Sequence, residues 1–486
     1  MAAVKGAGLT ALDRVIGYLS PGLQLSRVRS RVQLRAMMNY DAASRGRRTG
    51  AWRSPVSSAD AAGSFQGARA QLRNLARDFV RNRPFAARGV SVIAGNVVGS
   101  GVVPSVSSDN DRLQSVIEAY LSGRAIDAAG VLSLGEMQRS AMNGTVVDGE
   151  ILLRRRWRTG PFRDGLELPF QVEMIEADYL DPWITAWGKN EVVEGVEYGP
   201  TGAIVAYHIL RQHPGAAFSR RQIRPDRVAA ADIIHVFRPD RPGQTRGVSW
   251  FAPVMMTLGD LSDYQEAEIL KQKIASLMAG FIESPDEDVS TSGGPEKDAE
   301  DFGLAEVAPG TITELRPGQK LSWSQPPQVQ GFDAFMRQNL AAVAMGLGIT
   351  YESLAGDLAR VNFSSARMGR MEMDRNVEGW QRHIMIDRML RGIEVWIRDA
   401  VALLPEFAGV EFSIEWTAPR RPVIDPAREY PAIIKAIGAG LTSRSRSQRQ
   451  LGLDPDAIKK ERIADLKADQ ELDALRGDPD NGGANV

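Results

Sequence analysis

The sequence lacks the residue motifs of the common catalytic sites. No glycine-rich loop followed by Lys and Ser or Thr is present, which excludes a phosphate cradle of the Walker type. No serine lies in the nucleophile-elbow motif of the α/β-hydrolases. Asp and Glu are plentiful, so a catalytic carboxylate pair stays open, but no spacing indicates one. The sequence therefore points away from an enzyme, and no cofactor is expected.

The four histidines are the candidate nitrogen ligands for a metal, and the chain has no Cys to add to them. His208 and His213 fall in a predicted strand and the turn after it, His235 in a strand, and His383 in a helix. None belongs to an HExxH motif or has carboxylates at a matching spacing. We therefore expect these histidines on strand and helix surfaces, and no metal site. The lack of Cys also suits a reducing cytoplasm.

A row of arginines is the clearest candidate for binding anions. Residues 64–82 are predicted to form a helix, with an apolar stripe of Leu72, Leu75, Ala76 and Phe79. Beside that stripe an arginine recurs every four residues, at Arg69, Arg73, Arg77 and Arg81. Two interpretations stay open for this basic stripe: a solvated helix face, or contact with nucleic acid or with an acidic neighbour.

The distribution of charge adds two further surfaces. The formal net charge of the 486-residue chain is −1, so the chain as a whole has no signature of a polyanion-binding protein. Residues 1–90 hold 16 Lys or Arg against 4 Asp, whereas residues 283–306 hold 9 acidic residues and one Lys. This asymmetry predicts two surfaces with different partners. No segment of 18 uncharged apolar residues exists, so no membrane span is expected, and Asp13 and Arg14 argue against a signal peptide.

The elements that must position these residues follow from hydrophobic periodicity. A β-rich region over residues 145–237 is expected to precede a group of long helices. The expected succession is a helix Met255–Ile282, an acidic segment 284–301, a hairpin of residues 310–315 and 320–324, a helix Phe332–Leu347, a loop 348–363, a helix from Ser364 to about Leu403, and short helices after Pro426. A small β insert is thus predicted between two helices.

Five segments, in this order, resemble the lambda family of phage portal proteins. They are Tyr40–Trp52 (YDAA…RR…W), Ile175–Asp181 (IEADYLD), Arg241–Pro253 (RPGQTRGVSWFAP), Gly348–Arg367 (GITYESLAGDLARVNFSSAR) and Trp416–Asp425 (WTAPRRPVID). The resemblance implies an α+β portal fold with a wing, an α-helical stem, a small β-containing clip and an α-helical crown.

The resemblance also divides the chain into parts. These are a basic N-terminal arm (1–63), the wing (64–250), a stem helix (251–282), the clip (283–327), a second stem helix (328–347), a tunnel loop (348–363), a long helix with the return to the wing (364–425), and the crown with a disordered tail (426–486).

The loop at residues 348–363 is the predicted contact with DNA. By the resemblance it faces the channel, through Gly356, Asp357, Arg360 and Asn362. Gly356 permits a sharp turn. Asn362 could alternatively cap the helix that follows, which would explain that residue but not Asp357 or Arg360.

The function implied by the resemblance is a genome channel. Twelve subunits are expected to form a ring at one capsid vertex of the virion, assembled in the host cytoplasm. Implied partners are double-stranded DNA held without sequence preference, the terminase large subunit, the major capsid or scaffold protein, and a head-tail connector or adaptor protein. Two alternatives stay open, namely a nucleic-acid-processing enzyme, suggested by the basic N-terminal region, and a scaffold or adaptor without a channel.

Overall fold

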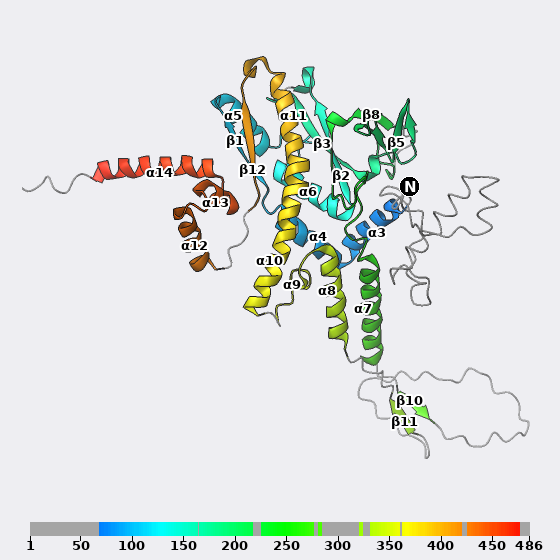
Figure 1. Ribbon diagram of the computed structural model, residues 1–486. Coiled ribbons are helices and arrows are strands. Elements are labelled where there is room, and N and C mark those ends of the chain that lie inside the picture. Colours follow the sequence, from blue (N-terminus) through cyan, green and yellow to red (C-terminus); the bar gives the residue numbers. More distant parts are fainter. Residues whose placement is uncertain are drawn as a thin grey trace, which may run out of the picture. The chain divides into compact units, whose positions relative to one another are not determined.

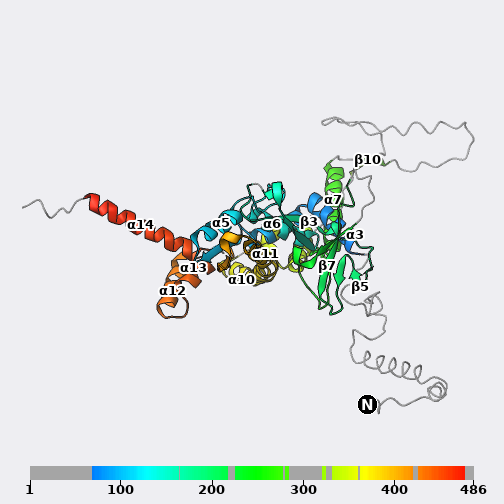
Figure 2. The same cartoon turned by 90° about the horizontal axis from the view of Figure 1, so that it is seen from above.

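The computed structural model describes residues 68–163, 165–216, 225–276, 280–283, 320–323, 331–359, 362–419 and 425–476. Helices and small sheets follow one another along these residues, which confirms the expected α+β class (Figure 1, and from above in Figure 2). No helix of the described ranges is long and apolar enough to cross a membrane. Short 3₁₀ turns occur at η3 (Gly160–Arg163), η4 (Ala177–Tyr179), η5 (Ala230–Asp232) and η7 (Pro405–Phe407).

Four helices at the start of the described chain contribute to the main core. They are α3 (Arg69–Asn82), α4 (Pro84–Val97), α5 (Asp111–Ser122) and α6 (Leu134–Val147). Pro84 begins the second helix, because a proline fits the first turn, where its missing N–H has no helical partner. A capping box of Ser133 and Glu136 starts α6. Ile93 and Val97 of α4 are fully buried.

Two antiparallel sheets account for the predicted β-rich region. In the three-stranded sheet, β2 (Glu150–Trp157) lies between β3 (Phe170–Glu176) and β9 (Ile233–Phe237). The five-stranded sheet is a meander of β4 (Ala186–Trp187), β5 (Asn190–Val193), β6 (Val196–Tyr198), β7 (Ile204–Leu210) and β8 (Pro225–Ala229). A turn follows β6, in which Gly199 N donates to Ala203 O over 2.8 Å.

The long helix α7 (Met255–Ser276) ends earlier than predicted. Residues expected at its C-terminal end instead form strand β10 (Gly280–Glu283), which pairs with β11 (Lys320–Trp323). The helix was therefore predicted too long, because helical periodicity is a local signal and does not register a strand partner far along the chain. The expected partner strand at 310–315 and the acidic segment 284–301 lie outside the described residues.

Helix α8 (Phe332–Leu347) has the predicted bounds and lies beside α7 (Figure 1). The contact is partly aromatic, since the ring centroid of Tyr264 is 5.6 Å from that of Phe332 and 4.6 Å from that of Phe335. Leu340 and Val343 are buried as predicted, whereas Phe335 is partly exposed.

The predicted helix of about forty residues is present as one continuous run. It comprises α10 (Phe363–Trp380), the π-helical stretch η6 (Gln381–Leu390) and α11 (Arg391–Ala402). Two i,i+4 ion pairs lie along it, Asp387–Arg391 at 3.3 Å and Glu394–Arg398 at 2.7 Å. A Cβ on Gly392 would lie 2.7 Å from the side chain of Ile234. The glycine thus allows α11 to approach β9.

The remaining elements are a strand pair between the N-terminal and C-terminal parts of the described chain, and the C-terminal helices. β1 (Val103–Ser108) pairs with β12 (Phe412–Thr417), a two-stranded sheet that the periodicity did not predict. The C-terminal helices are α12 (Pro426–Gly438), α13 (Arg444–Gln450) and α14 (Pro455–Arg476). With 22 residues, α14 is longer than the short helices expected there.

A buried ion pair connects the two larger sheets to the segment that leads into α7. Arg246 Nε lies 2.8 Å from Glu150 Oε1, and Glu150 has no exposed surface. Arg246 also donates to the carbonyls of Glu194 (2.8 Å) and Ala177 (3.1 Å). His235 Nε2 lies 2.8 Å from Glu150 Oε2. One guanidinium therefore joins the first residue of β2, the β5–β6 turn and the end of β3.

The ionisation of this group follows from its burial and its partners. Burial opposes charge on Glu150, but Arg246 and His235 outweigh it and hold the pKa of Glu150 well below its usual range. Burial lowers the pKa of His235. His235 is therefore neutral, and its Nε2–H donates a hydrogen bond to the carboxylate of Glu150.

Two glycines allow the backbones around this ion pair to touch. A Cβ on Gly149 would lie 2.3 Å from the backbone of Val248, and one on Gly247 would lie 2.1 Å from the carbonyl oxygen of Gly149. Gly149 also has φ +92°, a conformation that other residues rarely adopt. Gly247 N then reaches Glu150 Oε2 at 2.8 Å.

Replacing Arg246 by Met tests the importance of the ion pair. Because the change leaves Glu150 buried without its cation, we expect the free energy of unfolding to fall by about 3–5 kcal/mol, measured by urea denaturation. The control is Arg211→Met, which removes an exposed ion pair with Asp226 and should cost less than about 1 kcal/mol. Equal losses in the two variants would contradict the interpretation.

Candidate functional site

The arginines of α3 lie against carboxylates of the same chain. Arg73 Nη2 is 2.7 Å from Asp178 Oδ1, and Arg77 Nη2 is 2.8 Å from Asp178 Oδ2. Arg77 also contacts both oxygens of Asp148, at 2.8 and 2.5 Å. Asp148 follows α6 and Asp178 lies just beyond β3, so these pairs connect α3 to the three-stranded sheet and its helix.

The other two arginines differ from each other. Arg69 is buried and pairs with Glu194, the residue at φ +47° in the β5–β6 turn. Arg81 is exposed. A solvated helix face was therefore the wrong expectation for Arg69, Arg73 and Arg77, because each of these cations is held by an acidic neighbour. That neighbour belongs to the same chain.

Burial and the neighbouring arginines act in opposite directions on the pKa values of Asp178 and Asp148. Burial opposes ionisation of Asp178, but Arg73 and Arg77 outweigh it and hold its pKa below the usual value. Burial raises the pKa of Asp148 although Arg77 favours the charged form. The cluster is thus a set of internal ion pairs, which leaves little positive charge on Arg73 and Arg77 for an external anion.

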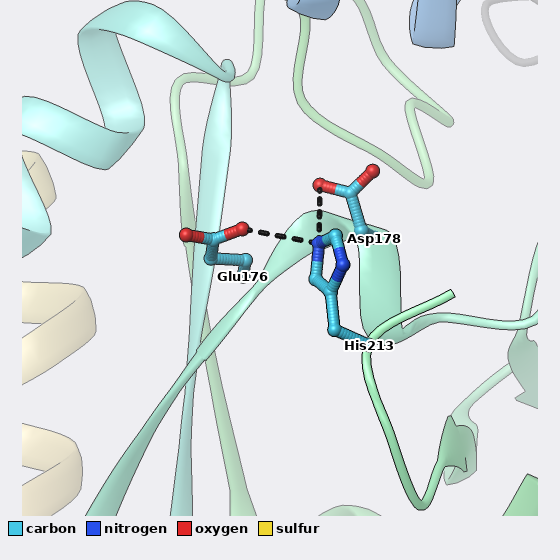
Figure 3. Close-up of side chains that lie close together, drawn as sticks. All are labelled: Glu176, Asp178 and His213. Carbon is cyan, nitrogen blue, oxygen red and sulfur yellow. Dashed lines mark ion pairs between the residues drawn. The ribbon is translucent and has the colours of Figure 1, made fainter. Parts of the chain in front are cut away.

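Three side chains in this region lie close enough together to be considered as metal ligands (Figure 3). His213 Nε2 is 3.4 Å from Glu176 Oε2 and 3.8 Å from Asp178 Oδ2. Motif spacing does not reveal this group, since Glu176 and Asp178 are far along the chain from His213. Arg77 already contacts both carboxylates, so a cation would have to compete with a guanidinium. An ion-pair network is the better description.

Two further histidines are buried, not on strand surfaces as predicted. His208 Nε2 lies 3.0 Å from Glu197 Oε2, and His235 contacts Glu150 as described above. Each imidazole is paired with a carboxylate on a neighbouring strand, so both groups can be buried while their hydrogen bond is kept. His383 is exposed on its helix, as expected.

The Glu197 carboxylate is the centre of a second polar cluster. Arg227 donates to both of its oxygens, at 2.7 and 3.0 Å, and Asn190 donates over 2.6 Å. These bonds, that from Arg227 foremost, lower the pKa of Glu197 to about 2. Since the donors lie on β5 and β8, with Glu197 itself on β6, the cluster ties the strands of the five-stranded sheet together.

The segment predicted to face DNA contains more regular structure than the expected loop. Helix α9 (Tyr351–Ala355) begins after Thr350, whose side chain accepts a hydrogen bond from Ser353 N. Gly356 ends the helix with φ +71°, so the sharp turn expected at this glycine is present.

Asp357 is held by its neighbours. Its Oδ2 accepts from Arg337 Nη2 at 3.0 Å and from the Tyr351 hydroxyl at 3.3 Å, and its Oδ1 accepts from Ala359 N at 3.0 Å. The partner of Asp357 is therefore a cation on α8. Arg360, the base expected beside it, lies outside the described residues. Asn362 is exposed immediately before α10.

A protein-family model matches most of the chain. The family described as phage portal protein, lambda family, matches residues 45–381. A probable portal protein of Halomonas phage phiHAP-1 is 27% identical over 426 residues, which are 82% of this chain and 81% of that protein. Portal protein B of Escherichia phage lambda is 24% identical over 462 residues, covering 85% and 86% of the two chains.

Solved structures show a more distant likeness. The neck of a native gene transfer agent particle, computed with C12 symmetry, is 16% identical with a TM-score of 0.46, covering 80% of this chain and 94% of that one. A HK97-family phage portal protein from Corynebacterium diphtheriae is 9% identical with a TM-score of 0.33, covering 75% and 98%.

The structural role of the α3 arginines can be tested with Arg77→Met. Loss of the cation leaves Asp148 buried, so we expect a loss of about 2–3 kcal/mol at neutral pH in urea denaturation. Burial raises the folded-state pKa of Asp148, so protonation removes part of this penalty and the loss should shrink as the pH falls towards 5. The control Arg81→Met should be nearly neutral. A marked loss of affinity for duplex DNA with unchanged stability would contradict this role.

Proposed function

The chain belongs to the lambda family of phage portal proteins, and from this premise we propose that it forms the ring through which the genome enters and leaves the capsid. As a portal protein it is a structural channel protein and not an enzyme. The family match over residues 45–381 carries the proposal, because it covers most of the chain.

Exposed apolar side chains on α7 and α8 support a ring. In the single chain Met256 is 79% exposed and Leu270 58% exposed, while Phe335 and Met345 on α8 are also exposed. We take these exposed side chains as surfaces that a neighbouring copy covers. Identical copies bound head to tail bury such faces and close into a ring.

The parts of the portal can be proposed from the elements around these helices. We assign α7 and α8 to the stem, and the β10–β11 hairpin between them to the clip. The clip is then the end that docks the terminase large subunit and later the head-tail connector. Helices α12 to α14 are assigned to the crown, and the elements from α3 to β9 to the wing.

The segment 348–363 is assigned to the channel wall. Asp357 is ion-paired with Arg337, which leaves the segment close to neutral. Each phosphate neutralised by a protein cation adds affinity for DNA, so a neutral wall lets DNA slide. This proposal treats Gly356, Asp357, Arg360 and Asn362 as weak, non-specific contacts repeated around the ring.

The first test is the mass of the assembled protein. Light scattering on the purified full chain should give a mass near that of twelve subunits, and negative-stain images should show rings. Neighbouring ring sizes are compatible with the proposal. A protein that stays monomeric or dimeric at all concentrations would overturn it.

The second test adds positive charge to the channel wall. Asp357→Lys replaces a carboxylate partner of Arg337 by a cation and so adds positive charge near the DNA, and packaging should therefore slow, most strongly at low salt, where screening is weakest. The control is Asp333→Lys, the same charge change beside the same arginine on α8. Rings should form in both variants. Equal packaging by Asp357→Lys and the wild type at every salt concentration would contradict the assignment.

A further inference from the structure

A hollow of about 620 Å³ lies where the long helix, β12 and the C-terminal helices meet. Four elements contribute to its wall, namely η6, α11, β12 and α13. The lining residues are Arg382, Ile386, Arg391, Glu394, Val395, Ile414, Glu415, Trp416 and Arg449. The hollow is thus lined by arginines from three of these elements and by aromatic and aliphatic side chains.

The charges around the hollow leave it positive. Arg382 and Arg391 share one carboxylate, that of Asp387, each at 3.3 Å. Arg449 pairs with Glu415, and Glu394 pairs with Arg398 outside the lining. Within the lining itself, three arginines therefore stand beside two glutamates. The side chains of Arg382 and Arg391 are also 54% and 55% exposed, so both remain accessible to an anion.

Two buried hydrogen-bond donors in the wall have no acceptor among the described residues. They are the indole Nε1 of Trp416 and the Nε of Arg449. Both groups can donate and neither can accept. A buried donor without a partner costs free energy, which an occupant carrying acceptor oxygens would recover. Together with the positive charge, these donors fit carboxylates.

Helix α14 carries carboxylates in a suitable arrangement. Glu461, Asp465 and Asp469 follow at intervals of four residues and so lie on one face. Residues 459–472 are all exposed, including Ile463 and Leu466, so this part of the helix does not pack on its own chain. An isolated helix of this length is marginally stable in water, so an exposed one gains from a partner.

We propose that the hollow binds the acidic face of α14 from a second copy of this chain. Within one chain α14 begins beside the hollow, because Arg449 of α13 is in the lining and Ser105 of β1 binds Asp454 and Asp456 at 3.1 Å. At ~1.5 Å per residue the 22-residue helix extends ~33 Å beyond that start, towards a neighbour. Each subunit then offers one helix and one hollow.

Such a contact is head to tail. A contact between two different surfaces of identical subunits, repeated with a fixed rotation, closes into a ring. The inference therefore rests on the proposed ring for the presence of a neighbour, and it adds which surfaces meet.

Cross-linking between thiols tests the contact directly, because the chain has no Cys. Two full-length chains with different affinity tags, one carrying Arg391→Cys and the other Asp465→Cys, are co-expressed and purified as assemblies. A short bismaleimide should then give a covalent dimer that contains both tags. The matched control replaces Asp465→Cys by Glu471→Cys, which lies about 120° away around the same helix and should cross-link far less.

The outcomes separate this inference from the proposed function. If light scattering shows rings but the Asp465→Cys yield equals that of the Glu471→Cys control, the inference fails and the ring stands. If no assembly forms, both fail. If the yield stays at the control level while Arg391→Glu lowers the affinity for a short DNA duplex, the hollow binds phosphates and the inference fails.

Charge reversal provides a second measurement. Asp465→Arg should raise the subunit concentration needed for half-maximal assembly about fivefold, as expected for loss of an accessible ion pair. Combining it with Arg391→Glu should restore assembly, whereas Glu471→Arg alone should have no effect. Failure of the double variant to recover, with each chain folded by circular dichroism, would overturn the pairing.

Discussion

The arrangement of the sheets depends on the burial of one carboxylate. Glu150 has no exposed surface, and an ion excluded from water is tolerated only with a counter-ion and satisfied hydrogen bonds. Arg246 supplies the charge, and its remaining donors reach the carbonyls of Ala177 and Glu194. Because a guanidinium is planar and rigid, satisfying all three contacts fixes three chain segments relative to one another. The entry to α7 is positioned by the same contact.

The same principle explains what the α3 arginines do. Arg73 and Arg77 could have formed a surface for nucleic acid, but Asp148 and Asp178 hold them inside the subunit. Positive charge that is neutralised internally does not add affinity for phosphates. Under the proposed function, this arrangement would let the genome pass without being held. The segment containing Asp357 follows the same pattern through its ion pair with Arg337.

The surfaces that the subunit leaves uncovered lie on its long helices. Exposed apolar side chains occur on α7 and α8, and the exposed part of α14 carries charged residues of both signs together with the exposed Ile463, Leu466 and Leu472. Helices gain most of their stability from packing, so these faces indicate partners. If neighbouring copies supply those partners, contacts within the ring stabilise the exposed helices.

The sequence by itself determined the helices α3 and α8, the long run from α10 to α11, and the lack of a nucleotide-binding loop, because these depend on residues close together in the chain. Tertiary structure decided the β1–β12 and β10–β11 pairs, the burial of His208 and His235, and the partners of the α3 arginines. Arg73 and Arg77 meet carboxylates 105 and 71 residues away. Periodicity shows that an arginine lies on a polar face, but only the fold determines whether water, DNA or a carboxylate meets it there.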